Sequence, residues 1–355
     1  MKLLIVTPTQ GHYGGMEGFV IGLAATVRAW PEFDVQVCFK LVGGRELKND
    51  LKEMASGLNC PVNYVYSCDF KLLKLIQWAD IVHGQNASPD IIFPALFLGK
   101  KVVLTIHNWR RRDFGLHSIL WGVGAKLVHR RWYISKFVWN TWESGQKAAG
   151  SECVPSVHHL PGVWYPPAER KGFLFLGRWI ENKGIEDLVI AYSRAHLDPV
   201  LWPLTLLGHG PLRPAVQSLI EKLDVKGVEL PGFIDEESKA KRLASCRWLV
   251  APSNTREDMG VTPIEARSAG VPTIVTRDGG LPEAGGDSSL IVEPGNIQQL
   301  TEALKRAAFM SNDEYCERGE RGRMTLKDYL RPVEFYRESY AAVLNGRPQQ
   351  NATVA

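Results

Sequence analysis

The chain has 355 residues, of which 45% are hydrophobic and 23% charged, a composition that excludes a disordered or fibrous protein. At this length we expect two domains of roughly 150 to 180 residues each. No apolar run reaches the ~18 residues that span a bilayer, and the N-terminal segment enters a strand instead of a secretion signal. We therefore expect a cytoplasmic protein.

The net charge of +4 is unevenly distributed along the chain. Residues 1–165 hold 18 Lys and Arg against 12 Asp and Glu, a net charge of +6. This basic half predicts an anionic partner, such as a membrane surface, a phosphate-bearing acceptor or nucleic acid. Nucleic acid is disfavoured because no recognition-helix or aromatic RNA-binding motif accompanies the charge.

Short apolar runs rich in β-branched residues recur along the chain, with helix-length segments between most of them. Strands that alternate with helices predict parallel sheets covered on both faces, in an α/β fold. The predicted strands of the first half are 3–7, 35–39, 62–66, 80–83, 102–106 and 132–135, and those of the second half are 173–177, 204–208, 228–230, 248–251, 273–276 and 290–292.

The segment 160–172 contains three prolines and two glycines, which suit a connection between domains better than a helix or central strand. We place an N-terminal domain at 1–165 and a C-terminal domain at 166–330. A helix at about 331–345 is expected to pack back on the first domain, and 346–355 is expected to be a flexible tail.

Ligands of open α/β sheets bind beyond the carboxyl ends of the strands, so the loops that follow strands are informative. After the first predicted strand, Gly14 and Gly15 precede a helix that offers free amide groups to a phosphate. A tight turn without any ligand would use the same glycines. After the first strand of the second half, Arg178 and Lys183 could grip a diphosphate, or could be two solvated surface charges.

The segment 251–283 holds two glutamates, Glu257 and Glu265, on either side of Gly260. With Thr262 as N-cap and a helix that starts at Pro263, Glu265 would complete a capping box. The alternative is that Glu265 binds the hydroxyl groups of a ligand. Glu257 has no such capping role, and the backbone amides of residues 258–261 could donate to sugar hydroxyls or phosphate.

In the first half, His107 follows a strand end and is either a structural or a functional histidine. Arginines at 110–112 follow it, with Trp109, Trp121 and Trp132 interleaved in the same region. This basic and aromatic segment could face an anionic membrane or a lipid-linked acceptor, or could be a solvated face.

Together and in this order, these segments resemble the retaining glycosyltransferases of family 4, also described as glycosyl transferases group 1, over most of the chain. The family has the GT-B fold, in which two doubly wound Rossmann-like domains face each other across a cleft. The segments that carry the resemblance are GGMEG (14–18), GRWIENKG (177–184), LLGHGPLR (206–213), LPGFID (230–235), EDMGVTPIEARSAGVPTIV (257–275) and GGLPE (279–283).

The resemblance implies a role for each matched residue. Arg178 and Lys183 would bind the donor diphosphate, Glu265 the ribose, and Glu257 with the amides of Asp258, Met259, Gly260 and Val261 the transferred sugar. Gly14, Gly15 and His107 would approach the donor from the first domain, and the base would lie near Gly208 and Phe233. Asp258 and Met259 replace the family's usual Gly-Phe pair, which puts the sugar selectivity in question.

The resemblance further implies transfer of a hexose, with retention at the anomeric carbon, to a glycan or lipid-linked glycan in polysaccharide biosynthesis. We expect a UDP-sugar donor, with GDP-mannose next, and possible peripheral contact with the inner face of the membrane. No Asp-x-Asp motif occurs, so neither a metal nor another cofactor is expected. Two alternatives remain: a nucleotide-sugar 2-epimerase on the same fold, and an inactive GT-B binding or scaffold protein.

Overall fold

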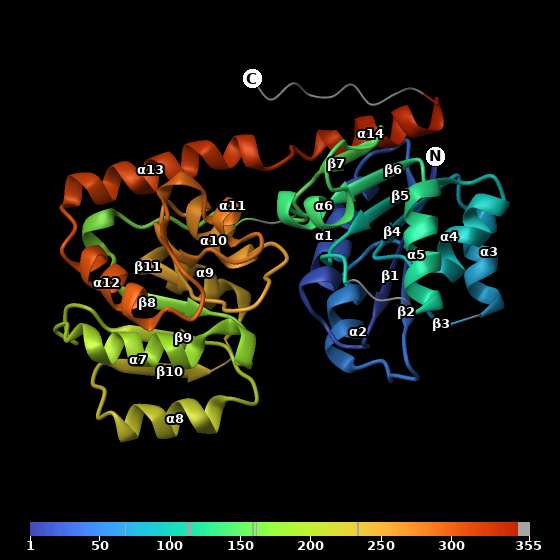
Figure 1. Ribbon diagram of the computed structural model, residues 1–355. Helices are drawn as coiled ribbons and strands as arrows, with labels where there is room; N and C mark the ends of the chain where they lie inside the picture. Colours follow the sequence, from blue (N-terminus) through green and yellow to red (C-terminus); the bar gives the residue numbers. More distant parts are fainter. Residues whose placement is uncertain (68, 112–114, 158–159, 161, 233, 347–355) are drawn as a thin grey trace. The chain divides into compact units, whose positions relative to one another are not determined.

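The computed structural model describes residues 1–67, 69–111, 115–157, 160, 162–232 and 234–346. The chain divides into two compact units, one comprising Met1–His159 with Leu330–Ala355, and the other Leu160–Tyr329 (Figure 1). This division lies a few residues before the expected boundary at 165/166. Residues 347–355 of the expected tail lie outside the described residues.

The first unit contains a seven-stranded parallel sheet in the order β3-β2-β1-β4-β5-β6-β7. Its central strands are buried on both faces, which explains why their sequences are almost continuously apolar. The strands are β1 (Lys2–Thr9), β2 (Asp34–Leu41), β3 (Val62–Tyr66), β4 (Ile81–Gln85), β5 (Lys101–Ile106), β6 (Arg130–Tyr133) and β7 (Ser151–Cys153).

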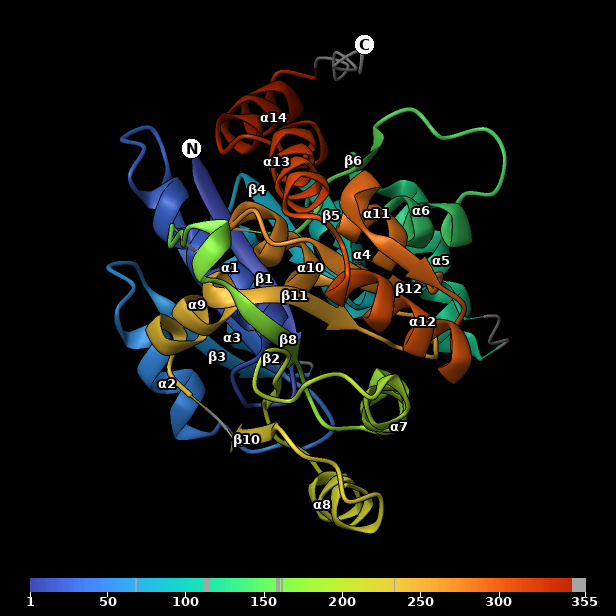
Figure 2. The same ribbon diagram turned by 90° about the vertical axis from the view of Figure 1, so that its left-hand side faces the viewer.

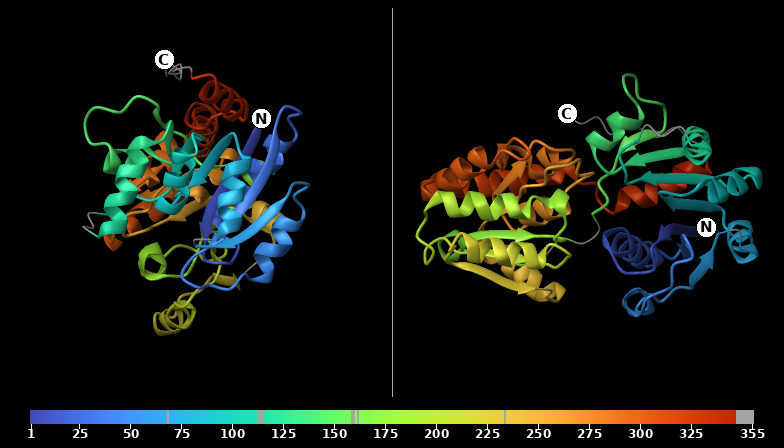
Figure 3. Two further views of the ribbon diagram at one scale, coloured as in Figure 1. Left: turned by 90° about the vertical axis from the view of Figure 1, so that its right-hand side faces the viewer. Right: turned by 60° about the horizontal axis from the view of Figure 1, so that its bottom comes forward.

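Helices cover both faces of this sheet, α1, α2 and α14 on one side and α3, α4 and α5 on the other (Figures 1 and 3). The helices are α1 (Gly15–Arg28), α2 (Asn49–Ser56), α3 (Phe70–Trp78), α4 (Pro89–Phe97), α5 (Leu116–Leu127), α6 (Lys136–Trp142) and α14 (Glu334–Leu344). In α14, Tyr336, Tyr340 and Val343 belong to the core of this unit together with Trp132. The C-terminal helix is therefore part of the first unit.

The second unit contains a six-stranded parallel sheet in the order β10-β9-β8-β11-β12-β13. On one face α7 and α12 pack against each other, and on the other face α9 and α10 contribute to a second apolar cluster (Figure 2). The elements are β8 (Lys171–Leu176), α7 (Ile185–Ala195), β9 (Leu204–Leu207), α8 (Arg213–Lys222), β10 (Val228–Gly232), α9 (Glu236–Ser245), β11 (Cys246–Ala251), α10 (Val261–Ser268), β12 (Thr273–Thr276), α11 (Leu281–Gly285), β13 (Leu290–Val292), α12 (Ile297–Ala308) and α13 (Asn312–Tyr329).

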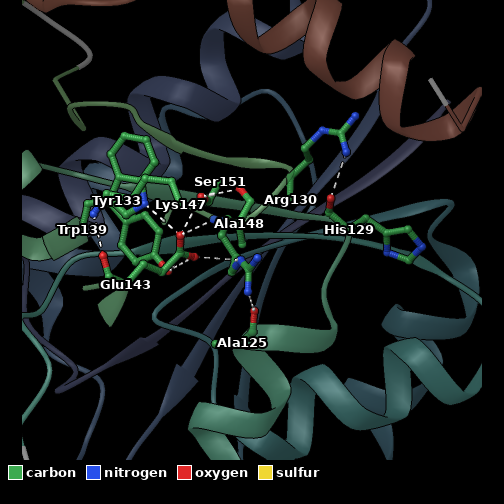
Figure 4. A network of polar contacts seen from close by, with 10 residues as sticks. Ala125, His129, Arg130, Tyr133, Trp139, Glu143, Lys147, Ala148 and Ser151 are labelled. Atoms are coloured by element: carbon green, nitrogen blue, oxygen red, sulfur yellow. Dashed lines mark hydrogen bonds and ion pairs between the residues drawn. The ribbon is translucent and has the colours of Figure 1, made fainter. Parts of the chain in front are cut away.

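All twelve predicted strands are present, and β7 is a strand that the sequence analysis missed. It is held at the sheet edge by the carboxylate of Glu143, which follows α6 (Figure 4). Glu143 accepts hydrogen bonds from the Ser151 hydroxyl (2.8 Å), the Ala148 amide (3.0 Å), the Trp139 indole (3.1 Å) and the Tyr133 hydroxyl (2.9 Å). A partly buried carboxylate, and not apolar patterning, thus fixes this edge.

Among the described residues, no helix combines the length and the hydrophobicity that crossing a bilayer requires.

Candidate active site

Three loops at the carboxyl ends of β8, β11 and β12 contact one another in the second unit. The short 3₁₀ turn η2 (Glu181–Lys183) ends at Gly184, whose φ of 65° is left-handed. A Cβ at Gly184 would lie 2.0 Å from the Pro252 carbonyl oxygen, so only glycine allows this approach. The Asn254 amide donates to the Asn182 carbonyl at 3.1 Å. These contacts bring Lys183 beside the loop that follows β11.

The Lys183 ammonium forms an ion pair with the Glu257 carboxylate, although 74 residues separate them in the sequence. The Ser253 hydroxyl donates to the same carboxylate oxygen at 3.3 Å. Both charged side chains keep 20% of their surface exposed, so a ligand can still reach them. The structure thus joins two of the residues that the sequence analysis selected as site candidates.

The backbone of Glu257 is held by the turn that follows β12. Its amide donates to Asp278 Oδ2 at 2.7 Å, and its carbonyl accepts from the Gly280 amide at 2.8 Å. Gly279 has a φ of 54°, and a Cβ there would lie 1.9 Å from the Glu257 carbonyl oxygen. Burial raises the pKa of Asp278, although the amide hydrogen bond from Glu257 opposes that shift. The sequence analysis did not select Asp278; its signal was the Asp-Gly-Gly turn directly after a strand.

The capping-box interpretation of Glu265 is wrong. Helix α10 begins at Val261, with Gly260 as N-cap in the left-handed region (φ 94°). Pro263 is then the third helical residue, so Glu265 lies too far along the helix to reach the cap amide. Its buried carboxylate instead accepts a hydrogen bond from the Lys239 ammonium of α9 at 3.2 Å.

The segment 258–261 leads into α10 as expected, with Met259 buried and Val261 at the first helical position.

Arg178 lies exposed after β8, and its side chain has no ion-pair partner among the described residues. Gly208 follows β9, and its amide donates to the Gly232 carbonyl at 3.1 Å. Phe233, which we expected near the base, lies outside the described residues.

The first unit has its own pocket, of about 860 Å³, beside the loop that contains Gly14 and Gly15. Gly14 is the N-cap of α1, and a Cβ at Gly15 would meet no atom within 4 Å. The pocket wall includes Lys40, whose ammonium binds the Ser88 hydroxyl (2.8 Å) and the Asp90 carboxylate (2.5 Å). The sequence signal for this polar wall was a lysine directly after the apolar run 37–39 of β2.

His107 is oriented by a chain of polar side chains that runs along β4 to α14 in the first unit. Its Nε2 lies 2.8 Å from Gln85 Oε1, and Gln85 Nε2 lies 2.9 Å from His83 Nε2. The Nδ1 atom of His83 lies 2.7 Å from the Tyr340 hydroxyl of α14. Because the Gln85 carbonyl can only accept, His107 carries its proton on Nε2, and its Nδ1 is an acceptor. Burial lowers the pKa of His107 to about 4, so the ring is neutral near pH 7.

Among the residues that the structure describes, no group of three His, Cys, Asp or Glu side chains is placed to hold a metal ion.

Residues 170–308 match the family model described as Glycosyl transferases group 1. This segment is a group 1 glycosyltransferase domain. It includes Lys183, Glu257, Glu265 and Asp278, whereas His107 and the pocket of the first unit lie outside it. The family resemblance seen in the sequence is therefore confirmed over residues 170–308.

Two curated glycosyltransferases illustrate this similarity. An uncharacterised glycosyltransferase of Methanocaldococcus jannaschii is 28% identical over 199 residues, 55% of this chain and 54% of the relative. The 2-deoxystreptamine N-acetyl-D-glucosaminyltransferase of Niallia circulans is 26% identical over 254 residues, 64% of each chain. The chain thus spans between about half and two thirds of the length of these relatives.

Among solved structures, HepE of Anabaena in complex with UDP superposes with a TM-score of 0.79 at 15% identity. The superposition covers 98% of this chain and 100% of HepE. The α/β fold of the GT-B class is therefore confirmed for this chain.

Proposed function

We propose that the chain is a retaining hexosyltransferase that takes a sugar from a nucleotide-sugar donor and adds it to a glycan or lipid-linked glycan in polysaccharide biosynthesis. The observation that carries the proposal is the accessible Lys183–Glu257 ion pair inside the group 1 glycosyltransferase domain. A UDP-sugar is the proposed donor, with GDP-mannose next, and the UDP bound to HepE supports uridine as the nucleoside.

The proposed donor contacts follow from the charges of the site. The exposed Arg178 and the Lys183 ammonium are assigned to the diphosphate, Glu265 to the ribose, and Glu257 with the amides of 258–261 to the sugar. From the first unit we assign Gly14, Gly15 and the neutral His107 to the donor as well. Gly208 and Phe233 are assigned to the base.

The chemical demand of the reaction is stabilisation of the charge that develops on the departing diphosphate. A preorganised donor contributes on the order of 3 kcal/mol to such a transition state. Lys183 meets this condition because the Glu257 carboxylate, which also accepts a hydrogen bond from Ser253, already holds its position before any ligand binds. The proposed reaction is metal-independent and uses no further cofactor.

An acceptor-dependence assay tests the proposed function. The purified chain is incubated in EDTA with UDP-glucose, UDP-N-acetylglucosamine or GDP-mannose, with and without an extract of bacterial lipid-linked glycans. We expect the extract to increase the release of nucleoside diphosphate from one donor at least tenfold, with no loss of rate in EDTA. Isomerisation of the sugar without extract would indicate an epimerase, and an absolute requirement for added Mg²⁺ or Mn²⁺ would contradict the metal-independent reaction.

A further inference from the structure

Helix α5 of the first unit exposes its bulky apolar side chains to solvent. Leu116 is 72% exposed, Ile119 52% and Leu127 56%, and Leu120 and Val123 are also exposed. These five positions recur at the three- and four-residue spacing that places side chains on one face of a helix. We name this set, Leu116, Ile119, Leu120, Val123 and Leu127, the α5 outer face.

The opposite face of α5 carries small residues. Gly122, Gly124 and Ala125 are buried, and a Cβ at Gly124 would lie 3.3 Å from Ile92 of the neighbouring helix α4. Packing against α4 therefore uses the smallest residues of the helix and leaves its leucine, isoleucine and valine side chains outside. A helix that served only to cover the sheet would bury its large apolar side chains and expose small or polar ones.

The region around α5 is strongly basic. In the sequence, residues 90–143 contain nine Lys and Arg against three Asp and Glu, and one of these nine, Arg131, is paired with Glu143. Lys126 is exposed on α5 itself, and a Cβ at Gly122 would lie 3.1 Å from Nη2 of Arg110, which places this guanidinium beside the middle of the helix. An apolar stripe bordered by cations matches the surface of an anionic bilayer, where apolar side chains enter the acyl boundary and cations contact phosphate groups.

The α5 outer face is continuous with the 860 Å³ pocket, because Leu116 and Leu120 belong to both. The remainder of the pocket wall is partly polar and includes Lys40, Asp90 and Glu17. A molecule with a polar head and a hydrocarbon chain would fit this arrangement, with the head in the pocket and the chain along α5.

We propose that the α5 outer face binds the surface of an anionic lipid bilayer, and that the adjoining pocket takes the head group of a lipid-linked acceptor from that bilayer. The choice of acceptor rests on the proposed glycosyltransferase function. Binding of the α5 outer face to the bilayer does not rest on that function, so an experiment can contradict the acceptor without contradicting bilayer binding.

The test uses sedimentation with vesicles of phosphatidylcholine, with and without phosphatidylglycerol. The variant Ile119→Ser/Val123→Ser/Leu127→Ser alters the α5 outer face but none of the pocket-lining residues. We expect wild type to bind the anionic vesicles and the triple variant to bind at least tenfold more weakly. The control variant Val200→Ser/Leu201→Ser removes two exposed apolar side chains from the second unit and should bind as wild type does.

Stabilisation by UDP serves as the folding control, and it should be the same in wild type and the triple variant. The proposal would be overturned if the wild-type protein did not bind anionic vesicles, or if the triple variant bound them as wild type does. A dimer in light scattering that the triple variant dissociates, without vesicle binding, would overturn it in favour of self-association. Vesicle binding without any response to nucleotides would support the bilayer-binding role of the α5 outer face and would contradict the proposed lipid-linked acceptor.

Discussion

Replacement of Lys183 by alanine is expected to slow release of the nucleoside diphosphate by about 10²- to 10³-fold, the usual loss when one preorganised donor is removed from a charged transition state. Two effects act in the same direction. The diphosphate loses a cation, and the Glu257 carboxylate, which is paired with Lys183 in the structure, is left to repel it. The measurement is the acceptor-dependent rate at saturating donor.

Lys222→Ala is the matched control for this variant, because Lys222 is an exposed lysine on α8 of the same unit. It should keep the wild-type rate, and Lys183→Arg should recover part of the activity because it restores the charge. A folded Lys183→Ala protein with wild-type turnover would show that the ion pair is only structural.

Replacement of Glu143 by alanine is expected to destabilise the first unit by about 3 kcal/mol, the lower end of the cost of breaking a buried ion pair. The Glu143 carboxylate lies 3.4 Å from the Arg131 Nε atom and accepts hydrogen bonds from four other groups around β6, α6 and β7 (Figure 4). Without it, the largely buried Arg131 guanidinium and the Tyr133 hydroxyl each lose a partner. Urea unfolding of wild type and variant measures the difference.

The pH dependence of this difference provides a second measurement. Although burial opposes ionisation, hydrogen bonds from the Ala148 amide, Ser151, Trp139 and Tyr133 lower the pKa of Glu143. A depressed carboxyl pKa stabilises the fold above the pKa of the unfolded state, so the gap between wild type and variant should narrow as the pH falls below about 4. Glu53→Ala, at an exposed position on α2, should show neither effect, and a similar loss there would contradict the assignment.

The strands were predictable because a parallel sheet buried on both faces requires apolar runs, and the twelve runs of this kind all became strands. Strand β7 was missed because Ser151–Cys153 has no such pattern and depends on Glu143 for its place. The local sequence of a strand does not show where a polar partner from another segment will lie.

Several features of the candidate site depended on neighbours that the sequence does not reveal. Lys183 and Glu257 were both selected from loops after strands, yet their contact depends on β8 and β11 being adjacent in the sheet. The error at Glu265 arose because Thr262 and Pro263 imitate a helix start, whereas Gly260 in its left-handed conformation is the cap.

The α5 outer face was also hidden in the sequence. A run such as LHSILWGVGAKL does not show which side of the helix meets the protein. The close approach of Gly124 to Ile92 decides this, because it places the small residues inside and the leucines outside.

Binding of a nucleoside diphosphate to the second unit through Lys183 can be measured with a thermal-shift panel of UDP, GDP and ADP in EDTA. A ligand at 100 times its dissociation constant adds about 2.7 kcal/mol to the free energy of unfolding. We expect a base-selective rise in Tm that is largest for UDP, survives EDTA and is lost in Lys183→Ala. Equal shifts in Lys183→Ala and wild type, or no shift with any nucleotide, would contradict it.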